Sequence, residues 1–444
     1  MQQQDASPSG ARPGPAPAAA APARTRGPSG RWPLRRLGWL AAAIALVQLA
    51  VALLAELRVP AGRERGIDIS ASYVAAGLWR NGLGDHLYDQ RLEAAGHAAI
   101  NAPGYRTDLP FITPPLTAVV TAPARLLGPD AGLRTLSALA VGALLVAVVV
   151  AARAAPGGAG SWRRLAVVLS VGAVPTLPLL LMGQWDGLCA AGLAGAYAAW
   201  RRDRALLAGL ALAVGIGLAK PHLGLGLAAF VVGRRDARAA LGALAGAGGL
   251  VLASLVLVGP RACIGFAGAL RLSLAHSPPA STLGGSGFAA SWLGDGGATA
   301  VLTAALAIAA VLGAGWLGAR SRRRRMFEPC LAGATALSLF ATPHLLGHDL
   351  VVLAPAFVWV AGWAVTKSRS EPIPRMDLPA WLLGAWLLFD LAAFADLGNA
   401  APAPPGRLVP LVLLAAAAWA FRVSREAAGQ SGRGRARGGV ESYA

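Results

Sequence analysis

Residues 205–258, ALLAGLALAVGIGLAKPHLGLGLAAFVVGRRDARAALGALAGAGGLVLASLVLV, decide the fold class. This stretch consists of three apolar runs, at 205–219, 222–233 and 239–258. A polar turn, Lys220-Pro221-His222, separates the first two runs, and an arginine-bearing turn at 234–238 separates the last two. Runs of this length and composition predict membrane helices, and their many Ala and Gly residues favour close helix packing.

The rest of the chain repeats this pattern. Of its 444 residues 55% are hydrophobic and only 14% are charged, and the mean hydropathy is +0.54. Further apolar runs lie at 38–57, 111–127, 131–152, 165–182, 187–200, 298–318, 329–342, 349–366, 379–397 and 408–421. Alternating strand patterns of the kind that build barrels do not occur. The sequence therefore predicts an all-α, polytopic membrane protein with about 12 spans, in a range of roughly 11 to 13.

The positive charges predict the topology. The net charge of +19 could suggest nucleic-acid binding, but the arginines cluster in short loops between apolar runs, which is the pattern of cytoplasmic loops. These loops lie at 153–164, 201–204, 234–238, 320–325 and 367–375. We therefore expect a multi-pass protein of the plasma membrane, surrounded by lipid, with both termini in the cytoplasm and no nucleic-acid partner. This topology requires 111–127 to be re-entrant or incomplete, and its prolines support that interpretation.

We expect three regions along the chain. Residues 1–36 form a disordered cytoplasmic tail, 37–422 a multi-pass transmembrane domain, and 423–444 a disordered basic cytoplasmic tail. Two loops of the middle region, 58–110 and 259–297, face outside. The first is predicted to contain short surface helices at 67–79 and 90–100, and the second to act as a lid or as part of an acceptor groove.

Polar residues at the ends of apolar runs are the candidate site. Gly183-Gln184-Trp185-Asp186, Lys220-Pro221-His222 and the stretch His344 to Asp349 are all predicted to face the same, extracytoplasmic side, and so is Asp68. Ionisable groups at membrane depth are costly and usually mark a functional site. Their position at the ends of spans favours an enzyme that works at one membrane surface.

Two carboxylates admit both a functional and a structural interpretation. Asp68 can accept a proton from a hydroxyl nucleophile, or it can simply begin a helix. Asp186 can bind a substrate, or it can serve only as an N-cap.

The basic residues likewise leave alternatives open. Lys220 suits an anion such as a phosphate, although a lysine at this depth can also reach the interface with its ammonium. Thr342-Pro343 predicts a helix start that places His344 and His348 on one helical face. With Asp349 these histidines could bind a metal, but no fourth ligand is evident, and we predict neither a metal nor a cofactor.

The sequence lacks the motifs of several other common site chemistries. Cys189, Cys263 and Cys330 stand singly, without metal-ligand spacing. No Walker loop, no dinucleotide-binding glycine pattern and no G-x-S-x-G motif occurs. These absences argue against nucleotide-driven transport and against a nucleotide-sugar donor held in a soluble domain.

The order of these motifs resembles glycosyltransferase family 87. The pattern that carries the resemblance is Asp68 with Ser72-Tyr73-Val74-Ala75-Ala76-Gly77, Gly84-Asp85-His86-Leu87-Tyr88-Asp89, Pro110-Phe111-Ile112-Thr113-Pro114-Pro115, Gly183-Gln184 with Asp186, Lys220-Pro221, and Thr342-Pro343-His344 with His348-Asp349. Two positions depart from the family pattern: Ile112-Thr113 replaces an aromatic before Pro-Pro, and Trp185 stands where an Asn often follows Gly-Gln.

This resemblance implies a GT-C architecture and an inverting transfer of a hexose, by family analogy mannose, from a polyprenyl-phosphate donor to a lipid- or wall-linked glycan. It implies Asp68 as the general base. Lys220, His344, His348, Gln184 and Asp186 would bind the donor phosphate or sugar. The residues expected to line the site or bind the acceptor are Tyr73, Asp85, Tyr88, His222 and Asp349.

Two other functions compete with this one. A transporter or flippase for a lipid-linked or anionic substrate would place paired broken helices and charges near the midplane of the bilayer. A non-catalytic scaffold would leave Asp68 and Lys220 dispensable.

Overall fold

The computed structural model describes residues 32–58, 67–101, 109–276, 278–367, 378–397 and 407–438. Within these ranges the protein is mostly helical and contains no strand. The first half of the chain forms α1 (Trp32–Arg58), α2 (Ile69–Arg80), η2 (Gly84–His86), α3 (Gln90–Ile100), α4 (Leu116–Thr121), η3 (Ala122–Leu127), α5 (Pro129–Ala154), α6 (Ser161–Val171), α7 (Thr176–Met182), α8 (Asp186–Arg201) and α9 (Ala205–Gly217). The second half forms η4 (Pro221–Gly224), α10 (Leu225–Arg234), α11 (Ala237–Leu257), α12 (Pro260–His276), η5 (Pro279–Ser281), α13 (Gly285–Leu293), α14 (Gly297–Arg320), η6 (Arg324–Met326), α15 (Phe327–Phe340), η7 (Gly347–Leu353), α16 (Ala354–Lys367), α17 (Ala380–Leu397) and α18 (Leu408–Gly438).

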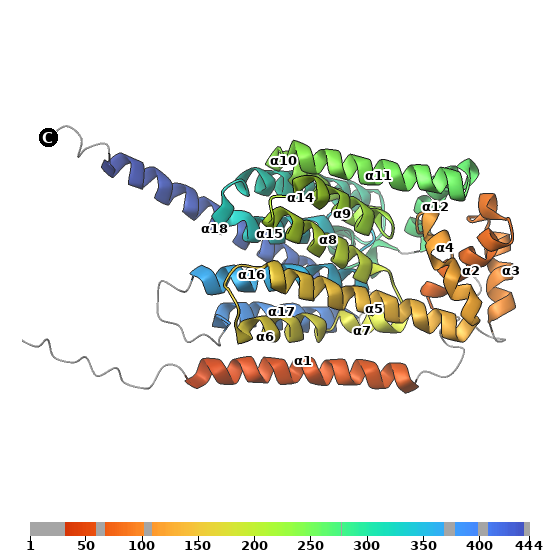
Figure 1. Cartoon of the computed structure of the whole chain (residues 1–444), viewed down its shortest axis with the longest axis horizontal. Coiled ribbons are helices and arrows are strands. Elements are labelled where there is room, and N and C mark those ends of the chain that lie inside the picture. Colours follow the sequence, from red (N-terminus) through yellow and green to blue (C-terminus); the bar gives the residue numbers. More distant parts are fainter. Residues whose placement is uncertain are drawn as a thin grey trace, which may run out of the picture.

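Most of the long helices lie side by side in one bundle (Figure 1). In the described ranges, 7 helices are long and apolar enough to cross a membrane, or 8 if the bent pair α6 and α7 counts as one span. The expected number of about 12 spans is therefore not confirmed. The difference arises because several apolar runs form short helices such as α9, with 13 residues, and α15, with 14.

The segment 111–127 forms two short helices, α4 and η3, in place of one long span. Together they cover only Leu116–Leu127, and at about 1.5 Å per residue this length is well below the roughly 30 Å of a hydrocarbon core. The hydroxyl of Thr117 donates to the carbonyl of Leu218 at 2.7 Å, which ties α4 to the end of α9.

A polar contact inside the bundle holds the break between α6 and α7, where the two helices meet at a bend of 50°. The Val174 amide, left free by the break, donates to the Asp390 carboxylate of α17 at 2.7 Å. Gln48 of α1 donates to the other oxygen of Asp390 at 2.6 Å. Gln48 and Asp390 were not predicted from the sequence, although polar residues inside apolar runs are an available signal.

The arginine-bearing turns meet at one end of the bundle, which we call the arginine end. There Arg201 at the end of α8 lies 3.3 Å from Glu328 of α15, and Arg234 at the end of α10 donates to the carbonyl of Ser321 at 2.9 Å. The indole of Trp363 donates to the carbonyl of Arg325 at 2.9 Å. α18 leaves this end and continues as a helix to Gly438, so the stretch 423–438, expected to belong to a disordered tail, is helical.

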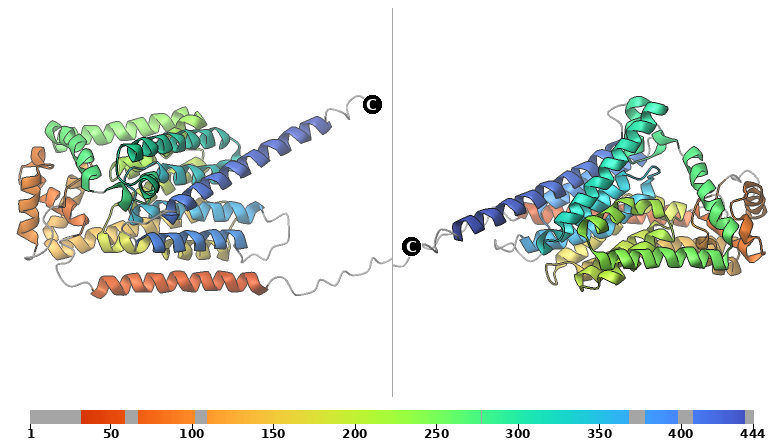
Figure 2. Two further views of the ribbon diagram at one scale, coloured as in Figure 1. Left: turned by 180° about the vertical axis from the view of Figure 1, so that it is seen from behind. Right: turned by 90° about the horizontal axis from the view of Figure 1, so that it is seen from above.

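The opposite end, which we call the loop end, carries α2, α3, α4 and α12 (Figure 1). Figure 2 shows these helices gathered away from the projecting end of α18. They enclose a small core of their own, made of Ala75, Leu78, Leu87, Phe111, Ala118, Val258 and Ala262. The two segments expected as outer loops thus consist largely of short helices. The expected tail at 1–36 and the last residues, 439–444, lie mostly or wholly outside the described part of the chain.

Candidate active site

A buried ion cluster lies at the loop end of the bundle. The ammonium of Lys220 donates to Asp349 at 2.7 Å and to Asp186 at 3.1 Å. Nδ1 of His348 lies 2.9 Å from Asp186 and 3.3 Å from the Lys220 ammonium. Asp186 and Asp349 are fully buried and His348 nearly so. Three segments far apart in sequence thus contribute to one polar centre.

Breaks in the helices bring these side chains together. Asp186 is the first residue of α8 and follows a turn at Gly183, whose φ of 63° favours glycine. Lys220 precedes the proline that opens η4. His348 and Asp349 belong to η7, where the Asp349 carboxylate accepts the Leu346 amide at 2.6 Å. The interpretation of Asp186 as only an N-cap does not fit, because its carboxylate contacts Lys220 and His348.

The charge balance of this cluster affects the role expected of Lys220. Two carboxylates, Asp186 and Asp349, surround a single ammonium. With both carboxylates ionised, the cluster offers no excess positive charge to a phosphate, and a proton on His348 would only bring its net charge to zero. Lys220 is therefore not the isolated cation that the sequence suggested, since both carboxylates already neutralise it.

Asp68 lies near the cluster, close enough for its charge to act on His344, and it contacts Gln184. The Gln184 amide donates to the Asp68 carboxylate at 2.6 Å, two residues before Asp186. The indole of Trp185 donates to the Ser72 hydroxyl at 3.2 Å, which fixes this turn against α2. Asp68 precedes α2, yet its side chain makes no capping hydrogen bond. Its carboxylate is partly exposed and points to Gln184.

Three histidines, His348 within the cluster and His344 and His222 beside it, have nitrogens that lack hydrogen-bond partners. These buried nitrogens are Nδ1 of His344, Nε2 of His222 and Nε2 of His348. Burial lowers the pKa of His344, Asp349 opposes this effect, and Asp68 is among the charges close enough to act on it. Buried imidazole nitrogens normally find a partner, so three free ones in one place suit a polar ligand.

The predicted helix start at Thr342 is wrong. The Thr342 hydroxyl donates back to the carbonyl of Ser338 at 3.0 Å, so this residue extends the end of α15. His344 then lies in an irregular segment, and the next helix begins only at Gly347. The two histidines consequently do not share one helical face.

Tyr73, Asp85 and Tyr88 lie elsewhere at the loop end. The Tyr73 ring is buried beneath the Arg125 guanidinium, whose central carbon is 4.3 Å from the ring centroid. Asp85 is exposed and lies against Gly259, at the junction of α11 and α12. The Tyr88 hydroxyl donates to the carbonyl of Thr113 at 2.7 Å.

The cluster contains donor atoms of the kind that bind metals. One ligand atom each from Asp186, His348 and Asp349 lie within 4.8 Å of one another. The ammonium of Lys220 already contacts both carboxylates, at 3.1 and 2.7 Å. A cation at this position would have to displace the lysine, so the donor set suits an internal ammonium better than a metal ion.

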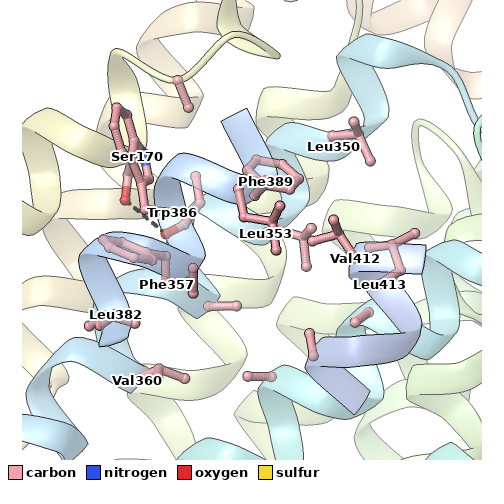
Figure 3. Close-up of a pocket in the computed structure, with 18 of the residues that line it drawn as sticks. Ser170, Leu350, Leu353, Phe357, Val360, Leu382, Trp386, Phe389, Val412 and Leu413 are labelled. Carbon is pink, nitrogen blue, oxygen red and sulfur yellow. Dashed lines mark hydrogen bonds between the residues drawn. The ribbon is translucent and has the colours of Figure 1, made fainter. Parts of the chain in front are cut away.

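An apolar groove begins next to the cluster. It has a volume of about 310 Å³ and lies between α6, η7, α16, α17 and α18 (Figure 3). Leu350 and Leu353 line it from η7, the same short helix that carries His348 and Asp349. Phe357, Trp386 and Phe389 form other parts of the wall. The polar centre and the apolar groove thus share one structural element.

Comparison with known proteins identifies the family. The model described as glycosyltransferase family 87 matches residues 111–343, which is more than half of the chain. The matched region includes Gln184, Asp186 and Lys220 and ends just before His344. No curated protein and no solved structure matches the chain. The match over half the sequence shows that the chain belongs to glycosyltransferase family 87, and the family together with the long apolar helices indicates a multi-pass membrane glycosyltransferase.

Proposed function

We propose that this protein transfers a hexose, by family analogy mannose, from a polyprenyl-phosphate donor to a lipid- or wall-linked glycan. We propose further that the reaction takes place at the outer face of the cytoplasmic membrane and inverts the anomeric centre. The observation that carries this proposal is the Asp68 carboxylate, partly exposed and held by Gln184 beside the buried ion cluster.

Asp68 acts as the general base in this scheme. Its carboxylate accepts the proton of an acceptor hydroxyl as the hydroxyl oxygen attacks the anomeric carbon. The bond from that carbon to the phosphate oxygen breaks, and the lipid phosphate leaves with the bonding electrons. One displacement with one base inverts the configuration. The Gln184 hydrogen bond supports this role because it fixes the carboxylate without neutralising it.

The residues bordering the cluster stabilise the leaving phosphate. The phosphate gains negative charge as the bond breaks, and N–H groups aimed at it lower the barrier. His344 and His222 have buried nitrogens without partners and are the best donors for this role. Asp186, Lys220, His348 and Asp349 hold the surrounding segments in place through their mutual contacts.

The apolar groove supports a lipid-linked donor. Leu350 and Leu353 of its wall belong to η7, the short helix that also carries His348. An isoprenoid chain lying in this groove would bring its phosphate towards the histidines. Because the chain would enter from the equally apolar bilayer, packing against the groove wall, and not removal from water, would favour its binding.

A transfer assay tests the proposal. Membrane vesicles containing the full-length protein receive radiolabelled polyprenyl-phosphate mannose and an alkyl-linked mannoside acceptor. We expect wild-type protein to transfer label and Asp68→Asn protein of equal abundance to lose transfer. Undiminished transfer by Asp68→Asn would refute the role of the base, and failure of the wild type with several polyprenyl-phosphate sugars would refute the donor class.

A further inference from the structure

A second cleft lies at the loop end, apart from the ion cluster. It has a volume of about 450 Å³ and is formed by α3, the segment before α4, and α12. Its lining residues are Tyr88, Gln90, Glu93, Phe111, Gly265, Gly268, Ala269 and Arg271. The volume is within the range of small-ligand sites. From these features we infer that the cleft is a saccharide-binding subsite for the outer sugars of a glycan acceptor, an inference that rests on the proposed function.

An aromatic side chain on one side of the cleft, Tyr88, suits the apolar face of a sugar ring. Tyr88 is half-buried, and its ring stacks on the buried Phe111 with centroids 5.3 Å apart. The hydrogen bond from the Tyr88 hydroxyl to Thr113 fixes the orientation of its ring. Rigid aromatic faces bind the carbon–hydrogen surface of a ligand at little entropic cost.

Planar polar groups on the other walls suit vicinal hydroxyls. Glu93 accepts the Phe111 amide at 2.9 Å, so its position is fixed and its carboxyl faces the cleft from a buried site. Gln90 and Arg271 are exposed at the rim. Carboxyl, amide and guanidinium groups each bind two neighbouring hydroxyls at once.

Little net charge lines the cleft. Among its lining residues one side chain, Glu93, is acidic and one, Arg271, is basic. A saccharide without charge is compatible with this lining.

The distance between the cleft and Asp68 determines which sugar of an acceptor the cleft can bind. Phe111 packs in the small core with Ala75 and Leu78 of α2, whereas Asp68 immediately precedes that helix. Ala75 and Leu78 follow Asp68 by seven and ten residues. At about 1.5 Å per helical residue, the cleft therefore lies roughly 10–15 Å from Asp68 along α2. A sugar in the cleft is therefore not the one whose hydroxyl reacts, and the subsite selects acceptors with more than one sugar.

Gly268 provides the means to test this subsite. A Cβ atom added at Gly268 meets nothing within 4 Å, so a larger side chain enters the open cleft without a clash. Gly248 in α11 is equally open and does not line the cleft, which makes Gly248→Leu a matched control for Gly268→Leu.

The first measurement is direct binding, which is independent of transfer. Detergent-solubilised full-length protein is titrated with mannotetraose. We expect wild type and Gly248→Leu to bind it equally, and Gly268→Leu to bind it at least tenfold more weakly. Equal binding by Gly268→Leu, or no binding by any of the three, would overturn the subsite even if transfer is normal.

The second measurement compares acceptor lengths. With polyprenyl-phosphate mannose as donor, KM is determined for alkyl-linked mono- and tetramannosides. We expect the KM ratio of tetra- to monomannoside to be about tenfold higher in Gly268→Leu than in Gly248→Leu. An unchanged ratio contradicts the subsite, whereas loss of transfer in every protein with binding intact contradicts the proposed donor and leaves the subsite supported.

Discussion

One ion cluster lies near each end of the helices α8 and α15, and the two clusters differ in how completely their side chains are hydrogen-bonded. At the arginine end, the Glu328 carboxylate accepts from the Tyr197 hydroxyl at 3.2 Å and lies 3.3 Å from Arg201. At the loop end, Asp186 begins the same α8, and His348 follows α15 by a few residues.

The first cluster is complete and the second is not. None of the buried side-chain oxygens and nitrogens of Tyr197, Arg201 and Glu328 lacks a hydrogen-bond partner, whereas the loop-end cluster leaves nitrogens of His348, His344 and His222 without one. Buried charge alone therefore does not mark a site in this membrane protein. Incomplete hydrogen bonding beside a partly exposed carboxylate is the more specific signal.

The largest expected effect is a difference in transfer rate between a variant at the loop end and a variant at the arginine end. Asp68→Asn should lower the transfer rate by about 10²- to 10⁴-fold, because it removes a general base with little change in shape. Glu328→Gln at the arginine end should leave transfer close to the wild-type rate. Initial rates at saturating donor measure both, and equal losses in the two variants would erase the distinction between the clusters.

Removing the ammonium of Lys220 should test how much the loop-end cluster's charge balance contributes to the stability of the protein. Lys220→Met leaves Asp186 and Asp349 facing each other, and loss of one partner of a buried pair costs about 3–5 kcal/mol. Arg201→Met should cost about 1 kcal/mol or less, because its side chain is 35% exposed. Thermal unfolding in detergent measures both. Adding Asp349→Asn to Lys220→Met should restore part of the stability, and no recovery would show that the charge balance is not the cause.

A smaller effect distinguishes a catalytic hydrogen bond from a structural one. His344→Ala should lower the transfer rate by about 10- to 100-fold, since a hydrogen bond to a charged group is worth about 1.5–3 kcal/mol. Because His344 is only half-buried, its loss should hardly change the unfolding temperature. Tyr197→Phe should show the reverse, with about 1 kcal/mol less stability and normal transfer. If His344→Ala unfolds earlier and transfers normally, the proposed role of His344 fails.

Sequence reasoning identified most of the residues that meet at the loop end, and the reason is physical. Polar residues at the ends of apolar runs are costly, so Gln184, Asp186, Lys220 and His348 stand out without any structure. It could not show that Lys220 is enclosed by two carboxylates, because spacing along the chain carries no information on contacts between distant segments. The helix start expected at Thr342 failed for a local reason, since a threonine hydroxyl can bond back to the preceding turn as well as cap the next one.

The fold class was equally accessible, but the number of spans was not. Apolar runs reveal helices, and most of the described residues are helical. Their lengths depend on where the helices break, and breaks such as the one between α6 and α7 are stabilised by partners on other helices, here Asp390. Glu93 was missed as a cleft residue because it lies in a polar segment, where a carboxylate does not stand out.

The last comparison sets the buried carboxyl of Glu93, which accepts the Phe111 amide, against that of Glu328, which lies 3.3 Å from Arg201. Burial raises the pKa of Glu93 to about 7, the Phe111 amide opposes this, and Asp89 adds to it. Tyr88 and Arg271 also line the space around it. Because the folded protein holds this proton more tightly than the unfolded chain does, stability is fully present below about pH 4.5 and declines as the pH rises through about 7. We expect a loss of at most about 3 kcal/mol over that interval. Glu93→Gln retains the acceptor for the Phe111 amide and should flatten this part of the profile of unfolding temperature against pH, whereas a slope as steep as that of the wild type would assign the titration to another group.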